Sequence, residues 1–591
     1  MKKIILFGAS RLGEIAYNVL KDKYDICYFC DNDKNKWKKD FCGIKIISPD
    51  DLLEYKNIKV IITSEYYIQI NEQLKKLEMQ DIQMFWYNDM NDKTYKAKYS
   101  IDKVIDVSQL ENVRINYELS DDYFNDFEQI CKSANKLEND YSKRKEGYKN
   151  VLMIAYAFPP AGGSGVQRTL KFAKYLRKYK WNPIILTTQN DYLACNRDYT
   201  LLSELNDDIP IIRIESNIIH FEQVDSVLLN QLLELIYGLV RDKNIMEQFL
   251  SEIRKNNWEK RKDVFEPDRY ICWANEVLKN ITKYIDFNNI DMIYSSSDPY
   301  SDHLIGYYLK KKFNVPLILD YRDAWINDPY KNKISNTKFQ LEYHMEKNMI
   351  DMADKVIHVT PLSCDDYIEI FNLKRSRICT ITNGYDEVDF KNVKDNEKYN
   401  KFTIIYGGML YDNRFSPQFI QACNELIEEN KIEGELINIE FYGKFFGDTL
   451  TKIREIDLYN IVNCDGYFSH EEALIKNSRS HILFLPVGEE EKYKKVYTGK
   501  IFEYMRLQIP ILALSPKGSV VEKIINETRT GINTQYDNVE EMKNFIFKHY
   551  NWWKNGEAYK DYNKEEIKKY ERKALTGKLA QVFEEVVNVI K

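Results

Sequence analysis

The chain has 591 residues, of which 44% are apolar and 30% charged, and its 85 basic and 91 acidic residues give a net charge of −6. This length is too great for one hydrophobic core and predicts roughly three or four domains. The mixed charges give no electrostatic footprint for nucleic acid as a main partner. The start, Met1-Lys-Lys-Ile-Ile-Leu-Phe-Gly8, lacks a small-residue cleavage site and is typical of a first strand, so we expect a cytoplasmic protein.

Residues 1–95 alternate strand and helix signals and are expected to form a small Rossmann-like domain of the nucleotide-binding type. The apolar run Lys3–Phe7 leads into the glycine turn Gly8-Ala-Ser-Arg-Leu-Gly13, which opens a helical pattern. Two further apolar runs, Ile26–Phe29 and Lys59–Thr63, complete a βαβ pattern. This alternation is typical of a parallel sheet.

The alternation stops over residues 96–149, which we expect to be a helical linker, and resumes in residues 150–390. There the strand Val151–Phe158 runs into a glycine loop and a helix, which predicts a second α/β domain. Its further expected strands are Pro183–Thr187, Met292–Ser296, Pro316–Asp320 and Lys355–Thr360.

Residues 391–591 repeat the rhythm and are expected to form a third α/β domain. The expected strands are Phe402–Gly408, Ile437–Tyr442, His481–Pro486 and Ile509–Leu514. Two terminal helices, Met542–Trp553 and Glu565–Ile590, either close this end or cross back to the middle domain. The predicted fold class is therefore α/β, with three Rossmann-like domains.

Polar residues in the middle domain follow the ends of its expected strands, where ligands of open parallel sheets gather. Gly162 and Gly163 stand at a helix start, where backbone N–H groups can approach a phosphate; a turn that packs the helix on the sheet is an equal alternative. Asp320, Arg322 and Asp323 lie at the end of the expected strand Pro316–Asp320. For Asp320, an internal pair with an arginine is as good an interpretation as a catalytic role.

The third domain offers two cations and a carboxylate. Arg414 follows the glycine turn Gly407-Gly408, where a guanidinium could clamp a diphosphate. Lys500 and Glu503 share one helix face, one suited to a phosphate and the other to sugar hydroxyls. An intrahelical Lys–Glu surface pair is the alternative, but a strand–helix junction is a poor place for idle charges.

Residues 150–590 resemble a family 4 glycosyltransferase of the GT-B fold. The resemblance lies in Phe158-Pro-Pro-x-Gly-Gly163, Asp320-x-Arg-Asp-x-Trp325 and Lys500-x-x-Glu-Tyr504 with Pro510, in that order. It implies an acceptor domain and a donor domain around a central cleft. It further implies sugar transfer from a nucleoside-diphosphate sugar, without a metal and generally with retention, onto a surface polysaccharide or lipid-linked acceptor.

The resemblance also assigns roles. Glu503 would hold the donor ribose, Arg414 and Lys500 the diphosphate, and the Gly162-Gly163 loop would face the reacting centre. The candidate catalytic residues are Asp323, Arg414 and Lys500, and the candidate donor-binding residues are Gly162, Gly163, Gly408, Arg414, Lys500 and Glu503. The chain departs from the family at Lys495, where a glutamate is usual, and at Gln508, where a glycine is usual.

Residues 1–90 resemble the small Rossmann domain at the front of some sugar acyltransferases and polysaccharide-synthesis proteins. Gly8, Ser10, Gly13 and Asp31 occupy the positions where such domains meet a nucleotide. A structural or regulatory module is an equally good interpretation of this domain.

Two alternatives for the whole chain stay open. The departures at Lys495 and Gln508 fit a nucleotide-sugar-binding scaffold that has lost activity, and Asp31 fits an NAD-dependent sugar-modifying enzyme. The apolar stretch Val227–Val240 is too short and too polar to span a membrane, but peripheral contact with the inner membrane face or a lipid-linked acceptor stays open beside ordinary core packing.

Overall fold

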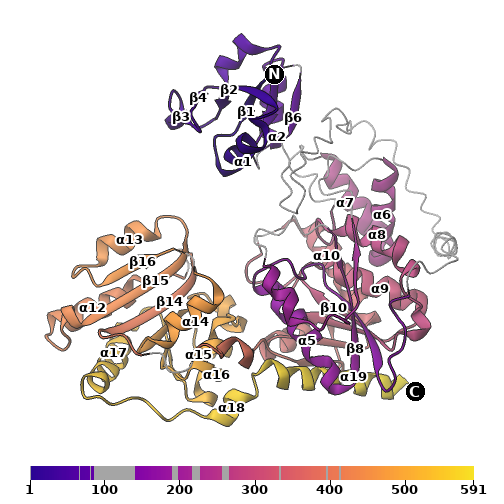
Figure 1. Ribbon diagram of the computed structural model, residues 1–591. Helices are drawn as coiled ribbons and strands as arrows, with labels where there is room; N and C mark the ends of the chain where they lie inside the picture. Colours follow the sequence, from indigo (N-terminus) through magenta and orange to yellow (C-terminus); the bar gives the residue numbers. More distant parts are fainter. Residues whose placement is uncertain are drawn as a thin grey trace. The chain divides into compact units, whose positions relative to one another are not determined.

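The computed structural model describes residues 2–64, 67–79, 81–84, 140–189, 198–215, 226–255, 265–331, 334–393, 397–411, 414–466 and 468–590. These residues form two compact units, one containing a small N-terminal sheet and the other two larger sheets (Figure 1). Most of the expected helical linker 96–149 lies outside the described residues. Its described end, residues 140–148, forms turns.

The N-terminal sheet has the strand order β3-β4-β2-β1-β5-β6. Its strands are β1 (Lys2–Phe7), β2 (Tyr24–Cys30), β3 (Asp40–Phe41), β4 (Ile44–Ile47), β5 (Lys59–Ile62) and β6 (Ile82–Met84), and its helices are α1 (Arg11–Leu20) and α2 (Tyr67–Lys76). Only β3 and β4 pair antiparallel within this sheet. Ile4 and Leu6 belong to the hydrophobic core on one face of the sheet, and Ile5 and Phe7 belong to the core on the other face, because successive strand residues alternate between faces.

The second sheet is wholly parallel, with the order β13-β12-β11-β10-β7-β8-β9. Its strands are β7 (Lys149–Ile154), β8 (Trp181–Thr188), β9 (Ile211–Ile214), β10 (Met292–Ser297), β11 (Leu317–Tyr321), β12 (Lys355–His358) and β13 (Ile378–Thr380). The α-helices around it are α5 (Ser164–Leu176), α6 (Ser226–Val240), α7 (Lys243–Lys255), α8 (Ile271–Asn280), α9 (Ser301–Phe313), α10 (Asn336–Met352) and α11 (Pro361–Phe371). Its central strands are continuous apolar runs because both faces are covered.

The third sheet is also parallel, with the order β16-β15-β14-β17-β18-β19. Its strands are β14 (Phe402–Leu410), β15 (Ile437–Phe445), β16 (Val462–Asp465), β17 (Ile482–Pro486), β18 (Ile511–Leu514) and β19 (Gly531–Thr534). Its helices are α12 (Pro417–Glu428), α13 (Thr449–Ile456), α14 (His470–Ser478), α15 (Lys500–Leu507), α16 (Val520–Thr528) and α17 (Val539–Lys554).

The C-terminal segment returns to the second sheet. The single helix expected over Glu565–Ile590 is two helices, α18 (Lys564–Lys568) and α19 (Arg572–Ile590), and α19 runs beside α5 (Figure 1). Leu579 and Phe583 of α19 belong to the same buried core as Leu170 of α5. Of the two alternatives for the C-terminal helices, the last one therefore crosses back to the middle domain.

In all three sheets the first strand lies near the middle. The chain adds strands on one side of it and then continues on the other, so the strand order reverses between β1 and β5, between β7 and β10, and between β14 and β17. The predicted α/β class with three Rossmann-like domains is confirmed. Ligands of such sheets bind at the carboxyl ends of the strands where the order reverses. Within the described residues, no helix combines the length and the apolar character that a membrane crossing requires.

A buried ion pair joins three segments of the second sheet. Arg168 of α5 donates to both carboxylate oxygens of Asp320 at the end of β11, over 2.6 and 2.8 Å. The same guanidinium donates to the carbonyls of Ile381 and Thr382, over 2.9 and 3.0 Å. Arg168 and Asp320 are 1% and 0% exposed, so Asp320 has the structural role that the sequence left open beside a catalytic one.

We predict that Arg168→Met lowers the free energy of unfolding by about 3–5 kcal/mol, because it leaves the Asp320 carboxylate buried without its partner. Urea denaturation followed by tryptophan fluorescence measures the change. Arg375→Met is the matched control, since the Arg375–Asp365 pair is exposed and worth about 1 kcal/mol or less. Equal losses in the two variants would contradict the role assigned to Arg168.

Candidate functional site

The predicted donor residues of the third domain come from the two connections that flank the point where the strand order of the third sheet reverses. Gly408 lies near the end of β14, and Arg414 follows that strand. The connection after β17 leads to α15, whose first turn carries Lys500 and Glu503. Residues that are far apart in sequence are thus brought to one sheet edge, where the topology places ligands.

Lys500 lies flat against the backbone of Gly408. A Cβ atom at Gly408 would stand 2.4 Å from Lys500 Nζ, and Gly408 has a φ of +148°, so only glycine fits there. The ammonium also lies 5.7 Å from the ring centre of Tyr406. Burial lowers the pKa of Lys500 against the opposing charge of Glu503, and Arg414 adds to the lowering.

Arg414 is held by aromatic side chains. Its Nη2 donates to the hydroxyl of Tyr330 over 2.9 Å, and the guanidinium lies 5.9 and 5.6 Å from the rings of Tyr330 and Tyr411. Among the described residues, no carboxylate forms an ion pair with Arg414 or with Lys500. Two half-buried cations without a counterion make this sheet edge attractive to an anion.

Glu503 is paired with a residue that the sequence analysis missed. Its Oε1 lies 2.9 Å from Nε2 of His470, the first residue of α14, so Glu503 pairs with His470 rather than with Lys500. The hydrogen bond to Glu503 raises the pKa of His470 to about 9. The capping box of Ser469 and Glu472 was the signal that could have placed His470 at a helix start.

The Gly162-Gly163 loop lies at the start of α5, with Gly163 as N-cap at a φ of +100°. Arg322 lies over Gly165, where a Cβ would stand 2.2 Å from its Nη1. Its Nη2 is 3.1 Å from Asp298 Oδ1 and 3.0 Å from Asp323 Oδ2. The candidate catalytic residue Asp323 is therefore tethered by Arg322 near the glycine loop, and it is 52% exposed.

Both departures from the family pattern have local structural reasons. Lys495 forms an ion pair with Asp366 of α11, which also accepts a hydrogen bond from Asn327 over 2.7 Å. Gln508 ends α15 in the left-handed conformation, at a φ of +53°, where glycine is the usual residue. Neither feature removes a group from the Lys500–Arg414–Glu503 cluster.

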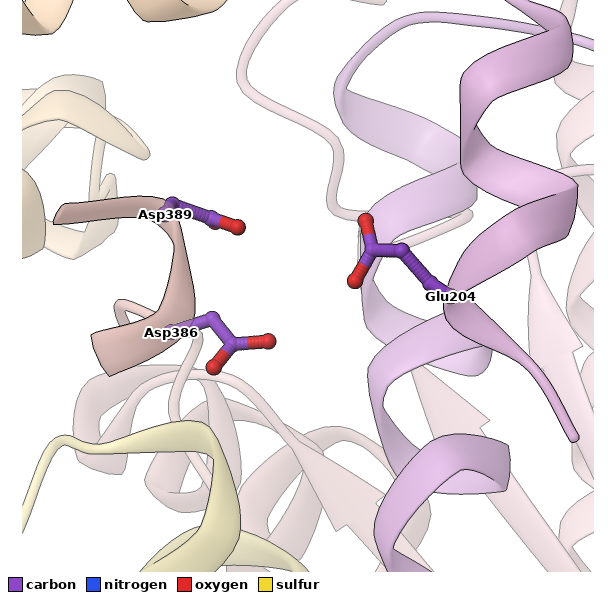
Figure 2. Close-up of side chains that lie close together, drawn as sticks. All are labelled: Glu204, Asp386 and Asp389. Carbon is purple, nitrogen blue, oxygen red and sulfur yellow. The ribbon is translucent and has the colours of Figure 1, made fainter. Parts of the chain in front are cut away.

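An acidic cluster lies at the connection between the two larger sheets. Asp386 and Asp389 point from one segment toward Glu204 of another, and their oxygens lie within 4.8 Å of one another (Figure 2). Lys171 Nζ lies 2.6, 2.9 and 3.1 Å from Glu204, Asp386 and Asp389, and Lys174 contacts the first two over 2.7 and 2.9 Å. Each of the three carboxylates is paired with at least one of the two ammonium groups, so the cluster is an ion-pair network.

The candidate nucleotide contacts of the N-terminal domain also lie together at the carboxyl ends of strands, since Gly8 follows β1 and Asp31 follows β2. A Cβ at Gly13 would lie 2.1 Å from the carbonyl oxygen of Gly8, so the glycines let α1 approach the turn closely. Ser10 is the N-cap of α1. Asp31 accepts from the backbone N–H groups of Ala9 and Asp33, each over 2.9 Å, and from Lys36 over 3.0 Å. The Asp31 carboxylate is thus engaged in holding the turn.

Comparisons with known proteins add the following. The family model described as C2185-like, N-terminal, matches residues 1–85. No curated protein matches the chain. Solved structures that resemble it include a glycosyltransferase from Rickettsia africae ESF-5, with 14% identity, 74% of this chain and 99% of that chain covered, and a TM-score of 0.47.

Two further similar structures are a sucrose-phosphate synthase and a UDP-glucose complex. The synthase, from Thermosynechococcus elongatus, has 13% identity, covers 75% of this chain and 100% of its own, and has a TM-score of 0.48. Anabaena Alr3699/HepE in complex with UDP-glucose has 13% identity, 75% and 99% coverage, and a TM-score of 0.42. At such scores the function has to be argued from the residues of this chain.

We predict that Asp386→Asn lowers the free energy of unfolding at pH 7 by about 1–3 kcal/mol, the value of hydrogen bonds to a charged group. Burial opposes the charged form of Asp386, but Lys171, Tyr175 and Lys174 outweigh it and hold its pKa well below the ordinary value. A lowered pKa stabilises the fold above the unfolded value of about 3.9 and ceases to do so as the pH falls. The difference between wild type and variant should therefore shrink below pH 4 in urea denaturation. A difference that stays constant down to pH 3 would contradict the ion-pair network.

Proposed function

We propose that residues 150–590 form a family 4 glycosyltransferase with the GT-B arrangement, which uses a nucleoside-diphosphate sugar as donor. The observation that carries this proposal is the pair of cations without counterion, Lys500 and Arg414, beside the carboxylate of Glu503 at the reversal point of the third sheet. A diphosphate needs two fixed positive charges, and a ribose needs a hydrogen-bond acceptor next to them.

In this proposal the diphosphate lies between Arg414 and Lys500. Gly408 leaves the lysine room to reach the phosphate, since any side chain there would meet Lys500 Nζ. Glu503 accepts hydrogen bonds from the ribose hydroxyls. The donor sugar then faces the loop of Gly162 and Gly163, which belongs to the acceptor domain.

In the transfer step, the bond between the anomeric carbon and the diphosphate oxygen breaks, and a bond to the acceptor hydroxyl oxygen forms. Lys500 and Arg414 stabilise the charge that develops on the leaving diphosphate, which is the main catalytic term in the absence of an enzyme nucleophile. With retention, the acceptor proton passes to the departing phosphate oxygen. Asp323, exposed beside the glycine loop, is the candidate to orient the acceptor hydroxyl, and this chemistry requires no metal.

We infer that the acceptor is a surface polysaccharide or a lipid-linked glycan at the cytoplasmic face of the membrane.

The N-terminal domain fits a structural or regulatory module better than an NAD-dependent enzyme, because the Asp31 carboxylate that would contact a ribose already accepts three hydrogen bonds. The inactive scaffold is the second candidate for the larger unit. A scaffold would bind the donor but release no nucleoside diphosphate.

A thermal-shift panel of UDP-, GDP-, ADP- and dTDP-sugars identifies the donor, and released nucleoside diphosphate measures turnover. We expect Lys500→Ala and Arg414→Ala each to lower kcat/KM by about 100- to 1,000-fold, as the loss of one group that stabilises transition-state charge does. Glu503→Gln should act mainly on the donor KM, with an increase of about 10-fold or more, typical of a lost charged hydrogen bond.

The matched controls are Lys523→Ala and Arg529→Ala, whose charges are exposed on the third domain. Both should keep wild-type turnover. Unchanged turnover in all three site variants would rule out the assigned site, and stabilisation by a donor without any released diphosphate would favour the scaffold.

A further inference from the structure

His470 is held at a fixed place by the start of α14. Ser469 caps the helix: its N–H and hydroxyl donate to Glu472 Oε2 over 2.9 and 2.7 Å, and its Oγ accepts from the Glu472 N–H. The ring of the next residue, His470, therefore starts from a pinned backbone. From there its Nε2 reaches Glu503 Oε1, 33 positions along the chain on α15, over 2.9 Å.

This contact leaves half of the Glu503 carboxylate available. Oε1 is bonded to His470, whereas in the described part of the chain no protein donor is bonded to Oε2. The Glu503 side chain is 28% exposed. A carboxylate with one oxygen fixed by the protein and the other open is suited to accept a hydrogen bond from a ligand hydroxyl.

We infer that His470 is a positioning residue of the donor site: its ring holds Glu503 so that Oε2 meets the ribose hydroxyls, and its protonation sets the affinity for the nucleotide. This inference rests on the proposed function, because it takes Glu503 as the ribose contact. The spacing of Lys500 and Glu503 in the sequence does not predict a role for His470. The inference therefore adds one residue to the proposed donor site.

The groups around the ring favour its charged form. Glu503 of α15 bonds it directly, and Asp389, from the connection between the larger sheets, adds a second negative charge, against the positive charge of Lys171 on α5. Tyr442 of β15, near Glu503, is a neutral phenol, because burial, followed by the charge of Glu503, raises its pKa above the ordinary value. With a pKa of about 9, His470 is an imidazolium at neutral pH and loses its charge only in the alkaline range.

The sign of the pH effect follows. Below its pKa, the protonated ring of His470 orients Glu503 through a charge-assisted hydrogen bond. The ring also adds one positive charge near an anionic ligand. Above it, the neutral ring holds the carboxylate less strongly. The nucleotide should therefore bind more weakly as the pH rises through about 9, the pKa of His470.

The test compares wild type with His470→Gln by isothermal calorimetry, using whichever of UDP, GDP, ADP and dTDP gives the largest thermal shift. At pH 7 we expect His470→Gln to raise the Kd by about 3- to 10-fold, the difference between a charged and a neutral hydrogen bond. The ratio of the two Kd values should fall toward one between pH 8 and pH 10. Burial lowers the pKa of Lys500, but any effect of its titration cancels in this ratio, since both proteins carry that lysine.

A double-mutant cycle separates positioning from a structural effect. In a Glu503→Gln background, His470→Gln should change the Kd by less than about 2-fold, because its partner is already altered. His344→Gln on α10, where the ring packs 5.6 Å from Tyr343, is the matched control and should bind like wild type at every pH. Circular dichroism at pH 7 checks that each variant is folded.

The outcomes are distinct. A Kd ratio that does not depend on pH, or an equal effect of His470→Gln with and without Glu503, would overturn the role of His470 while leaving the transferase proposal in place. If wild type binds none of the four nucleotides and turns over none of their sugars, the proposed function itself fails, and the inference about His470 fails with it.

Discussion

The buried pair of Arg168 and Asp320 fixes the geometry at the carboxyl ends of the strands in the second sheet. Arg168 lies in the helix that begins at the glycine loop, and Asp320 is the last residue but one of the strand that leads to Arg322 and Asp323. Because the same guanidinium binds the carbonyls of Ile381 and Thr382, it also anchors the connection toward the third sheet. Burying an ion pair costs free energy of desolvation, but separating or removing one partner of a buried pair is strongly destabilising. Such a pair therefore suits a point where three segments must keep one arrangement.

The second organising feature is the contrast between compensated and uncompensated charge. At the connection between the larger sheets, Lys171 and Lys174 form ion pairs with three carboxylates, and the cluster holds the connecting segment against the second sheet's domain. At the edge of the third sheet, the cations Lys500 and Arg414 are left to phenol rings and glycine backbone. Similar side chains thus serve stability in one place and, in the proposed function, anion binding in the other, and the difference is whether carboxylates form ion pairs with them.

The sequence was informative where a local pattern determines the outcome. Buried strands such as β11 and β17 are continuous apolar runs and could be predicted, whereas short edge strands such as β16, which is largely exposed, carry no such pattern. The break before α19 depends on Tyr385, whose backbone N–H and carbonyl bind Tyr570 and Arg572 far along the chain. The pairing of Glu503 with His470 was missed for the same reason, because intrahelical spacing favoured Lys500 and only the tertiary fold brings α14 beside α15.

Two glycines near the strand ends of the larger sheets make room for cationic side chains. Gly408 leaves room for Lys500, and Gly165 leaves room for Arg322, since a Cβ would stand 2.4 Å from one cation and 2.2 Å from the other. In each domain a long cationic side chain therefore lies flat on the backbone at the sheet edge. A side chain at either glycine would displace the cation that packs on it. Gly165 and Gly408 thus fix the positions of Arg322 and Lys500, each a charged residue from a different element of the same domain.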